Sequence, residues 1–251
     1  MSEAKKNILI LVEGAKTDVK IMEKLFSIYG IDAKFQIVPY CTNIYTLYKE
    51  MFSDDIDGFE DKDIRLILRA REKDLEKKKI LDDRYTDILL VFDLDPHDPQ
   101  YDPENIKLMQ KYFSDSSDMG QLYLNYPMVE AFYHLESIPD DQYCDRKVFM
   151  TELKNKQYKS RVQKETRGNA YSKFANKKDE YTIVILQNLA KALFLINGQV
   201  VEYNEALELS SLVDLNIILQ RQVQNLEKHK FVYVLCTCIF FIMDYNRKLL
   251  I

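Results

Sequence analysis

The chain has 251 residues, of which 47% are hydrophobic and 30% are charged. This composition is typical of a folded globular protein and excludes a largely disordered chain, and the low content of Gly and Pro predicts no long flexible linker. The formal net charge of −5, taken alone, argues against a nucleic-acid partner. The four Cys are scattered without a CxxC pair, which argues against zinc, and the amino terminus is unlike a secretory signal. We therefore expect reduced thiols and a cytoplasmic location.

The first half of the chain alternates predicted strands and helices. Strands are expected at residues 7–13, 34–40, 87–93 and 121–125, because each is an apolar run of strand length. Helical patterns separate them: Thr17 begins one that ends at Gly30, and others cover residues 43–52, 64–83 and 103–113. This alternation predicts an α/β fold with a mainly parallel four-stranded sheet flanked by helices.

The second half of the chain is mostly helical in pattern. Candidate helices cover residues 146–161, 181–197 and 203–228, and an apolar segment follows at 231–243. A segment of this length is too short to cross about 30 Å of hydrocarbon as a helix, so we expect a buried element and no membrane association. The predicted organisation is a domain at residues 1–140 and a partly basic helical appendage at 141–251.

Acidic residues follow two of the predicted strands. Glu13 comes directly after the first apolar run, and Asp93 and Asp95 follow the run that begins at Ile88. Carboxyl ends of parallel strands meet at one edge of a sheet, where open α/β sheets bind their ligands. Carboxylates gathered there repel one another unless a cation lies between them, and hard oxygen ligands suit Mg²⁺.

The segment Val12–Asp18, followed some eighty residues later by Asp93-Leu94-Asp95, resembles the Toprim domain. Toprim domains occur in topoisomerases, bacterial primases, small RNA-maturing ribonucleases and OLD-type nucleases. The resemblance covers roughly residues 7–135, and the spacing from Glu13 to Asp18 is most similar to the small restriction-linked and OLD-like proteins of phage defence. It implies a Toprim-like fold and a nuclease that uses Mg²⁺ or Mn²⁺.

The resemblance also implies roles for individual residues. Glu13 would transfer protons at the scissile phosphate or complete the metal site, and Asp93 and Asp95 would hold the ion. Asp18 matches the position at which OLD-like proteins often carry a further acidic ligand. The alternative for Glu13 is a cap on the following turn, and for the Asp pair an acidic turn after a strand.

Three further residues are candidates for the rim of this site. They are His97 and Asp98 in the loop after the Asp pair, and Glu130 near the start of a predicted helix, where the helix dipole favours a carboxylate. The alternative for His97 is an ordinary polar loop residue, which is the commoner role of a loop histidine near carboxylates. His134 lies on an otherwise apolar helix and is expected to be structural.

One segment of the chain is strongly basic. Residues 146–178 hold eleven Lys and Arg but only Glu152 and Glu165, a net charge of +9 that leaves −14 for the remainder. Such segregation predicts a phosphate-binding surface, whereas the alternative is a charged amphipathic helix with a solvated loop. Aromatic residues Tyr158, Tyr171 and Phe174 within it suit stacking on unpaired bases. The predicted nucleic-acid contacts are Lys154, Lys156, Lys159, Arg161, Lys164, Arg167 and Lys173.

Together these patterns predict a metal-dependent nuclease that hydrolyses phosphodiester bonds in DNA or RNA, with tRNA among its candidate substrates. The resemblance implies an anti-phage, abortive-infection effector held by an ATPase partner, and the chain itself has no Walker motif. The apolar surface of the last helices also allows a homodimer. The alternative from another class is a non-catalytic Toprim-fold module that binds or regulates a partner.

Overall fold

The computed structural model describes residues 6–52, 63–117 and 119–251. The chain divides into two compact units. The first unit comprises Met1–Lys20, Ile31–Phe92 and Asp102–Tyr123, and the second comprises Ile21–Gly30, Asp93–Tyr101 and Leu124–Ile251. The predicted boundary at residue 140 stays a prediction, since each unit is assembled from several separate segments.

The first unit is built on a mainly parallel sheet. The strands are β1 (Asn7–Val12), β2 (Lys34–Pro39), β3 (Asp87–Asp93), β4 (Ser114–Asp115) and β5 (Gly120–Asn125), in the order β2-β1-β3-β5-β4. β1 pairs in parallel with both β2 and β3, whereas β4 pairs antiparallel with β5. The α/β class and the parallel core agree with the prediction, but the sheet has five strands rather than four.

The central strands form because their side chains are apolar on both faces. Residues Ile8 to Val12 of β1 and Leu89 to Phe92 of β3 are at most 1% exposed. Continuous burial of this kind is characteristic of a parallel strand with neighbours on both sides. At the other side of β3, Gly120 has a φ of +121°, and a Cβ there would lie 2.6 Å from Leu90 Cδ1. Only glycine allows this backbone to approach the sheet core so closely.

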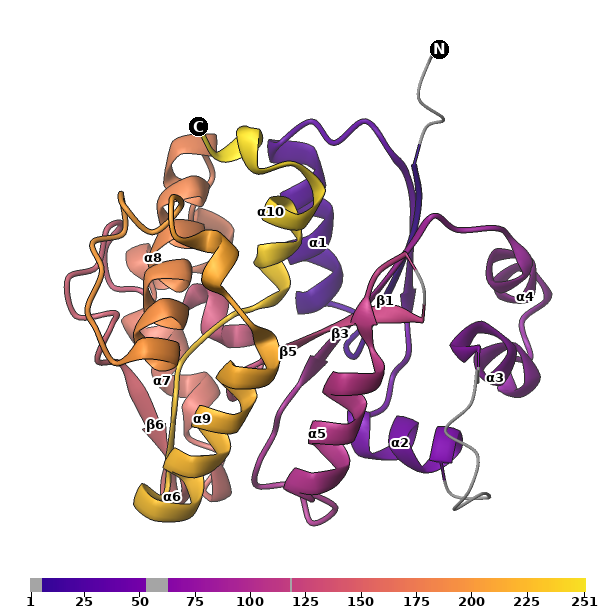
Figure 1. Ribbon diagram of the computed structural model, residues 1–251, viewed down its shortest axis with the longest axis horizontal. Helices are drawn as coiled ribbons and strands as arrows, with labels where there is room; N and C mark the ends of the chain where they lie inside the picture. The colour runs from indigo at the N-terminus through magenta and orange to yellow at the C-terminus, as the bar shows by residue number, and fades with distance from the viewer. Residues whose placement is uncertain (1–5, 53–62, 118) are drawn as a thin grey trace. The chain divides into compact units, whose positions relative to one another are not determined.

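The helices of the first unit follow the strands (Figure 1). They are the first residues of α1 (Thr17–Ile28), then α2 (Ile44–Phe52), α3 (Ile64–Arg71), α4 (Leu75–Asp82) and α5 (Pro103–Tyr112). The charged segment predicted as one helix is thus two, α3 and α4, because Asp74 accepts hydrogen bonds from the amides of Glu76 and Lys77 and begins a new helix. α2 packs against α5, where the ring of Phe52 meets that of Tyr112 at 5.3 Å.

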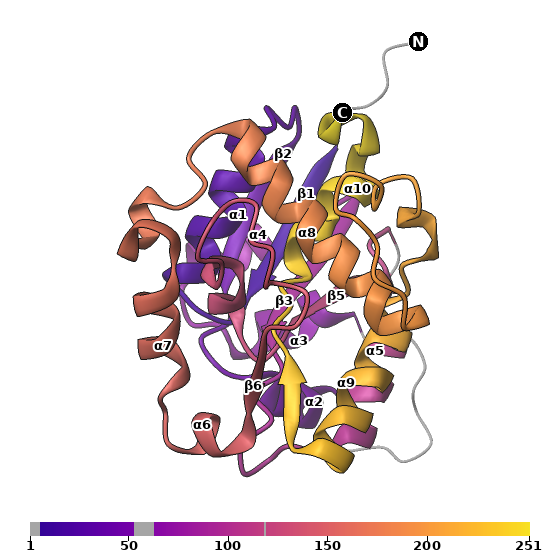
Figure 2. The ribbon, with the colours of Figure 1, turned by 90° about the vertical axis from the view of Figure 1, so that its left-hand side faces the viewer.

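The second unit is mainly helical with a small hairpin (Figure 2). Its elements are the 3₁₀ helix η1 (Val129–Tyr133), α6 (Met150–Lys154), α7 (Tyr158–Glu165), α8 (Lys178–Asn197), α9 (Leu215–His229), α10 (Phe241–Asn246), and the antiparallel strands β6 (Lys147–Phe149) and β7 (Phe231–Tyr233). Figure 2 shows β6 and β7 between α6 and α7 on one side and α9 on the other.

The structure corrects two helix predictions for this half, and the expected helix at 203–228 begins only at Leu215, where α9 starts. The expected helix at 146–161 is instead β6, α6 and α7, because residues 147–149 pair with Phe231–Tyr233. The apolar segment at 231–243 is therefore part strand and part helix, and it is buried as expected. Within the described residues, no helix has both the length and the apolar character needed to cross a membrane.

Candidate metal centre

Glu13 and Asp93 are positioned by the pairing of β1 with β3. Val12 is opposite Val91 in the parallel register, and the Glu13 amide donates a 2.9 Å hydrogen bond to the Val91 carbonyl. Asp93 is the last residue of β3, two positions after Val91. Both acidic side chains therefore lie at the carboxyl ends of neighbouring strands. The strand order places β2 beyond β1 and β5 beyond β3. The strand order therefore reverses between β1 and β3, and open α/β sheets bind their ligands at such a topological switch point.

Asp95 is held in place by its backbone. Leu94 donates to the carbonyl of Asn125 at 3.0 Å, and Asp95 donates to the carbonyl of Pro127 at 2.9 Å. The φ of Asp95 is +37°, a left-handed conformation that Asp and Asn adopt more readily than other residues with a Cβ but that is still uncommon. Backbone strain of this kind is concentrated at functional sites in proteins, because the surrounding structure must maintain it.

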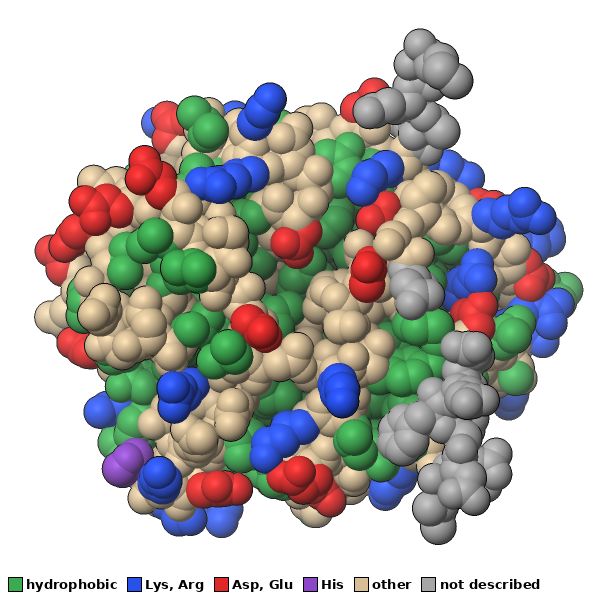
Figure 3. Space-filling view, viewed as in Figure 1, with side chains coloured by type: hydrophobic (Ala, Val, Ile, Leu, Met, Phe, Trp, Pro, Cys, Tyr) green, Lys and Arg blue, Asp and Glu red, His purple; other side chains and the backbone are tan. Residues whose placement is uncertain are grey.

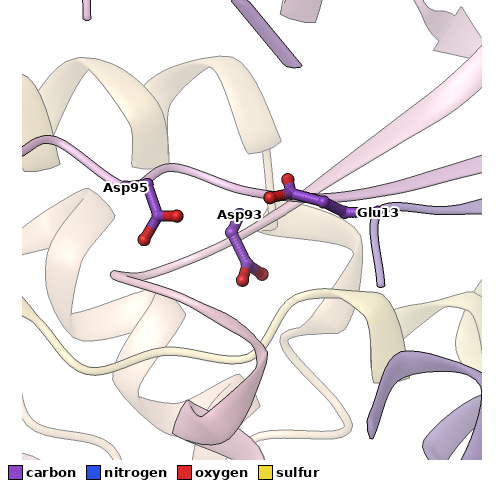
Figure 4. A group of neighbouring side chains, drawn as sticks. All are labelled: Glu13, Asp93 and Asp95. Carbon is purple, nitrogen blue, oxygen red and sulfur yellow. The ribbon is translucent and has the colours of Figure 1, made fainter. Parts of the chain in front are cut away.

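The three acidic side chains form one group (Figure 4). One carboxylate oxygen from each of Glu13, Asp93 and Asp95 can be chosen so that all lie within 4.8 Å of one another. Figure 4 shows Glu13 extending toward the two Asp side chains. Asp93 is buried, while Glu13 and Asp95 are partly exposed. Three hard oxygen donors at this spacing fit Mg²⁺ or Mn²⁺ and leave further coordination positions for water or phosphate.

The electrostatic environment of Asp95 is unfavourable to its charged form. Burial raises its pKa to about 7, an effect that Lys159 opposes and that Glu130 and Asp98 increase. Asp95 Oδ1 is buried and accepts no hydrogen bond from the described part of the chain. A carboxylate in this situation is stabilised when a cation binds beside it.

Asp18 lies outside the group of three oxygen ligands found among the described residues. It occupies the first turn of α1, is 4% exposed and lies close to Gly14. A Cβ at position 14 would be only 2.5 Å from Asp18 Oδ2, so a larger residue there would displace this carboxylate. Its role as a metal ligand stays a prediction.

The predicted rim residues occupy different positions in the second unit. His97 Nδ1 lies 4.0 Å from Asp95 Oδ1, and burial lowers the pKa of His97. Asp98 accepts a hydrogen bond from the amide of Gln100 at 2.7 Å and so shapes the loop. Glu130 is 6% exposed and forms a 3.0 Å ion pair with Lys159.

Lys159 brings a positive charge to these carboxylates. Burial lowers its pKa, but Glu130, Asp93 and Asp95 outweigh that effect, and the net pKa is raised. Its ammonium group is therefore kept charged by the acidic residues around it. The sequence suggested Lys159 only as one of several phosphate contacts, since its pairing with Glu130 joins residues far apart in the chain.

The other predicted nucleic-acid contacts divide into two groups. Four of them have solvent-exposed side chains: Lys154, Lys156, Lys164 and Lys173. The two arginines are engaged by acidic residues, with Arg161 bonded to Glu152 and Glu165 and Arg167 to Glu180. A phosphate would have to compete with these carboxylates for either arginine. The face drawn in Figure 3 carries interspersed charges of both signs, without a surface of one sign.

The aromatic residues of the basic segment are less available than the sequence suggested. Phe174 is fully buried and packs against Phe132 and Tyr133, so it cannot stack on a base. Tyr171 is stacked on Tyr133 at 4.1 Å. Tyr158 is 1% exposed, and its hydroxyl lies 3.2 Å from His134 Nδ1. His134 is buried between Tyr158 and Glu165, in agreement with its expected structural role.

Sequence reasoning did not find one feature beside Asp95. Met128, Leu153 and Tyr158 are buried apolar residues that line a cavity with Asp95 and three polar or charged side chains. No sequence motif marks these residues, because they come together only through the packing of η1 with α6 and α7.

Comparisons of the chain with protein-family models, curated proteins and solved structures found no match.

Proposed function

We propose that this protein is a Toprim-type nuclease that hydrolyses phosphodiester bonds with the help of Mg²⁺ or Mn²⁺. The observation that supports this function is the group of three carboxylates at the ends of β1 and β3. The order and spacing of the Toprim-like motifs add to it. Together they favour phosphoryl-transfer chemistry over the alternative of a structural acidic turn. Such a turn after one strand would not require a carboxylate from a second strand.

Glu13, Asp93 and Asp95 are the residues that would hold the ion. A bound divalent ion polarises a phosphoryl oxygen and makes a water more acidic. Lys159, beside Asp93 and Asp95, reduces the repulsion between these carboxylates and an approaching phosphate. Glu13 is more exposed than Asp93, so it is the better placed of the two to exchange a proton with water.

Wider roles of the protein are proposed from the resemblance alone. They are an anti-phage effector that cuts RNA, including tRNA, or DNA, and a separate ATPase that restrains it. Coexpression with the product of a neighbouring ATPase gene and plating of phage would test both. The expected result is protection from phage that Asp93→Asn abolishes, and protection that Asp93→Asn retains would contradict the proposal.

The direct test is cleavage by the purified protein. End-labelled single-stranded RNA, single-stranded DNA and duplex DNA are incubated with Mg²⁺, Mn²⁺ or EDTA, and products are separated on a denaturing gel. Loss of a metal ligand in Glu13→Gln or Asp93→Asn should reduce the rate by about 100-fold or more. Asp141→Asn, which changes an exposed acidic residue, is the matched control.

Two outcomes would contradict the proposal. The first is cleavage that persists in EDTA and in both metal-ligand variants. The second is absence of metal binding by calorimetry together with absence of cleavage of all three substrates, which would favour the non-catalytic binding module.

A further inference from the structure

A cavity of about 240 Å³ lies next to Asp95 in the second unit. Its buried wall is apolar and is formed by Met128, Leu153 and Tyr158, which are each at most 6% exposed. Its exposed rim carries Lys156 and Lys159, with His97 beside Asp95. The cavity therefore combines an apolar interior with two cations and borders one proposed metal ligand.

The size of the cavity limits what can occupy it. At about 30 Å³ for each water molecule in the liquid, it has the volume of about eight waters. This is smaller than the clefts of 300 Å³ or more that are usual for drug-sized ligands, and it suits one flat ring system. The apolar wall favours such a ring, and the lysines favour a phosphate attached to it.

The backbone at Lys156 supports a role for this side chain. Lys156 follows the end of α6 and has a φ of +57°. Its amide bonds to the Leu153 carbonyl, and the amide of Gln157 bonds to the Glu152 carbonyl. This is a Schellman motif, in which the left-handed position is usually glycine. The chain has a lysine there instead, despite the strain, and this lysine lines the cavity.

We propose that this cavity receives one unpaired nucleoside of the nucleic-acid strand that is cut at the carboxylate group. The proposal rests on the proposed function, which places the scissile phosphodiester beside Asp95. The base lies against Met128, Leu153 and Tyr158, and a neighbouring phosphate contacts Lys156 and Lys159. A base inside a duplex is stacked on both faces and cannot enter, so the protein prefers single-stranded segments and loops.

The test measures binding in EDTA, so that its result does not depend on metal or on cleavage. The probes are a labelled oligouridylate, a labelled oligothymidylate and a DNA duplex of mixed sequence, followed by fluorescence anisotropy. Leu153→Trp fills the cavity, and Leu108→Trp, on the exposed surface of α5, is its matched control. Lys156→Gln removes a rim charge, and Lys228→Gln removes an exposed charge on α9, outside both the cavity and the predicted nucleic-acid contacts.

Leu153→Trp should weaken binding of at least one single-stranded probe by about tenfold and leave duplex binding within about twofold, because one base contact is lost. Lys156→Gln should weaken single-strand binding more than Lys228→Gln does. Circular dichroism shows whether each variant is folded. If Leu153→Trp is unfolded, the binding of Lys156→Gln alone tests the nucleoside site.

Three results would overturn the nucleoside site. They are unchanged single-strand binding by folded Leu153→Trp, an equal loss of single-strand and duplex binding, or equal effects of the two lysine substitutions. Selective loss of single-strand binding without any metal-dependent cleavage would support the nucleoside site while refuting the nuclease. Metal-dependent cleavage and single-strand binding that are unchanged by all the cavity substitutions would support the nuclease while refuting the nucleoside site.

Discussion

Replacement of Asp95 by Asn tests the electrostatics of the carboxylate group in the metal-free protein. Burial raises the pKa of Asp95 from its ordinary value of 3.8 to about 7, although Lys159 opposes the shift. The folded state then binds this proton more tightly than the unfolded state does, so stability falls as pH rises from 3.8 to 7. Asn has nearly the same shape, tolerates the positive φ of +37° and cannot ionise.

The magnitude follows from the size of the pKa shift. The raised pKa of Asp95 lowers the free energy of unfolding of the wild type by about 4 kcal/mol at pH 8 but only by about 2 kcal/mol at pH 5, where the folded state keeps the proton and the unfolded state loses it. In EDTA, Asp95→Asn should therefore gain stability over the wild type between pH 5 and pH 8, by about 2 to 3 kcal/mol. All other titrating groups are shared by the two proteins and cancel in this difference.

Urea unfolding at the two pH values, followed by circular dichroism, measures the effect. Asp141→Asn serves as an exposed control and should show no such gain. Added Mg²⁺ should reverse the order, because the wild type keeps all three ligands. A difference that does not change with pH, or a variant less stable than the wild type at pH 8 in EDTA, would refute this account of Asp95.

Three further predictions concern stability. Mg²⁺ at 100 times its dissociation constant should stabilise the wild type by about 2.7 kcal/mol in thermal unfolding, and Asp93→Asn should lose this gain. Arg146→Met should cost about 3 to 5 kcal/mol in urea unfolding, because Arg146 is 5% exposed and its loss leaves the buried Asp140 carboxylate without its cation; an effect no larger than that of Arg161→Met would contradict this. Burial lowers the pKa of His134 to about 4, so the wild type should lose up to about 3 kcal/mol as pH falls from 6.5 to 4. His134→Gln should remove that pH dependence, and an unchanged slope would show that other groups cause it.

The strands of the sheet core were predictable because their signal is local. Residues 87–93 form β3 as predicted, and β1 ends one residue before the expected boundary. β4 was missed because two residues give no periodic pattern, and they pair only because β5 lies beside them. The helix predicted at 146–161 failed for the same reason: β6 depends on a partner strand more than eighty residues away.

The candidate site was predictable in part. The positions of Glu13 and Asp93 follow from strand ends that the sequence reveals, and their proximity follows from the pairing of β1 with β3. The ion pair of Lys159 with Glu130 and the wall formed by Leu153 were not predictable, because both depend on how α6 and α7 fold back. Local pattern thus locates the acidic residues, while tertiary packing determines what surrounds them.

The wall of the cavity and the proposed metal ligands belong to different parts of the sequence. Leu153, Lys156 and Tyr158 lie within a few residues of one another, whereas Glu13 and Asp93 belong to the sheet. If the proposed nucleoside site is correct, substitutions in this short stretch should change which nucleic-acid strand is preferred while the acidic residues stay constant. Residues 153–158 would then form a compact region in which natural or engineered substitutions alter specificity for the nucleic-acid strand without changing the proposed hydrolytic reaction.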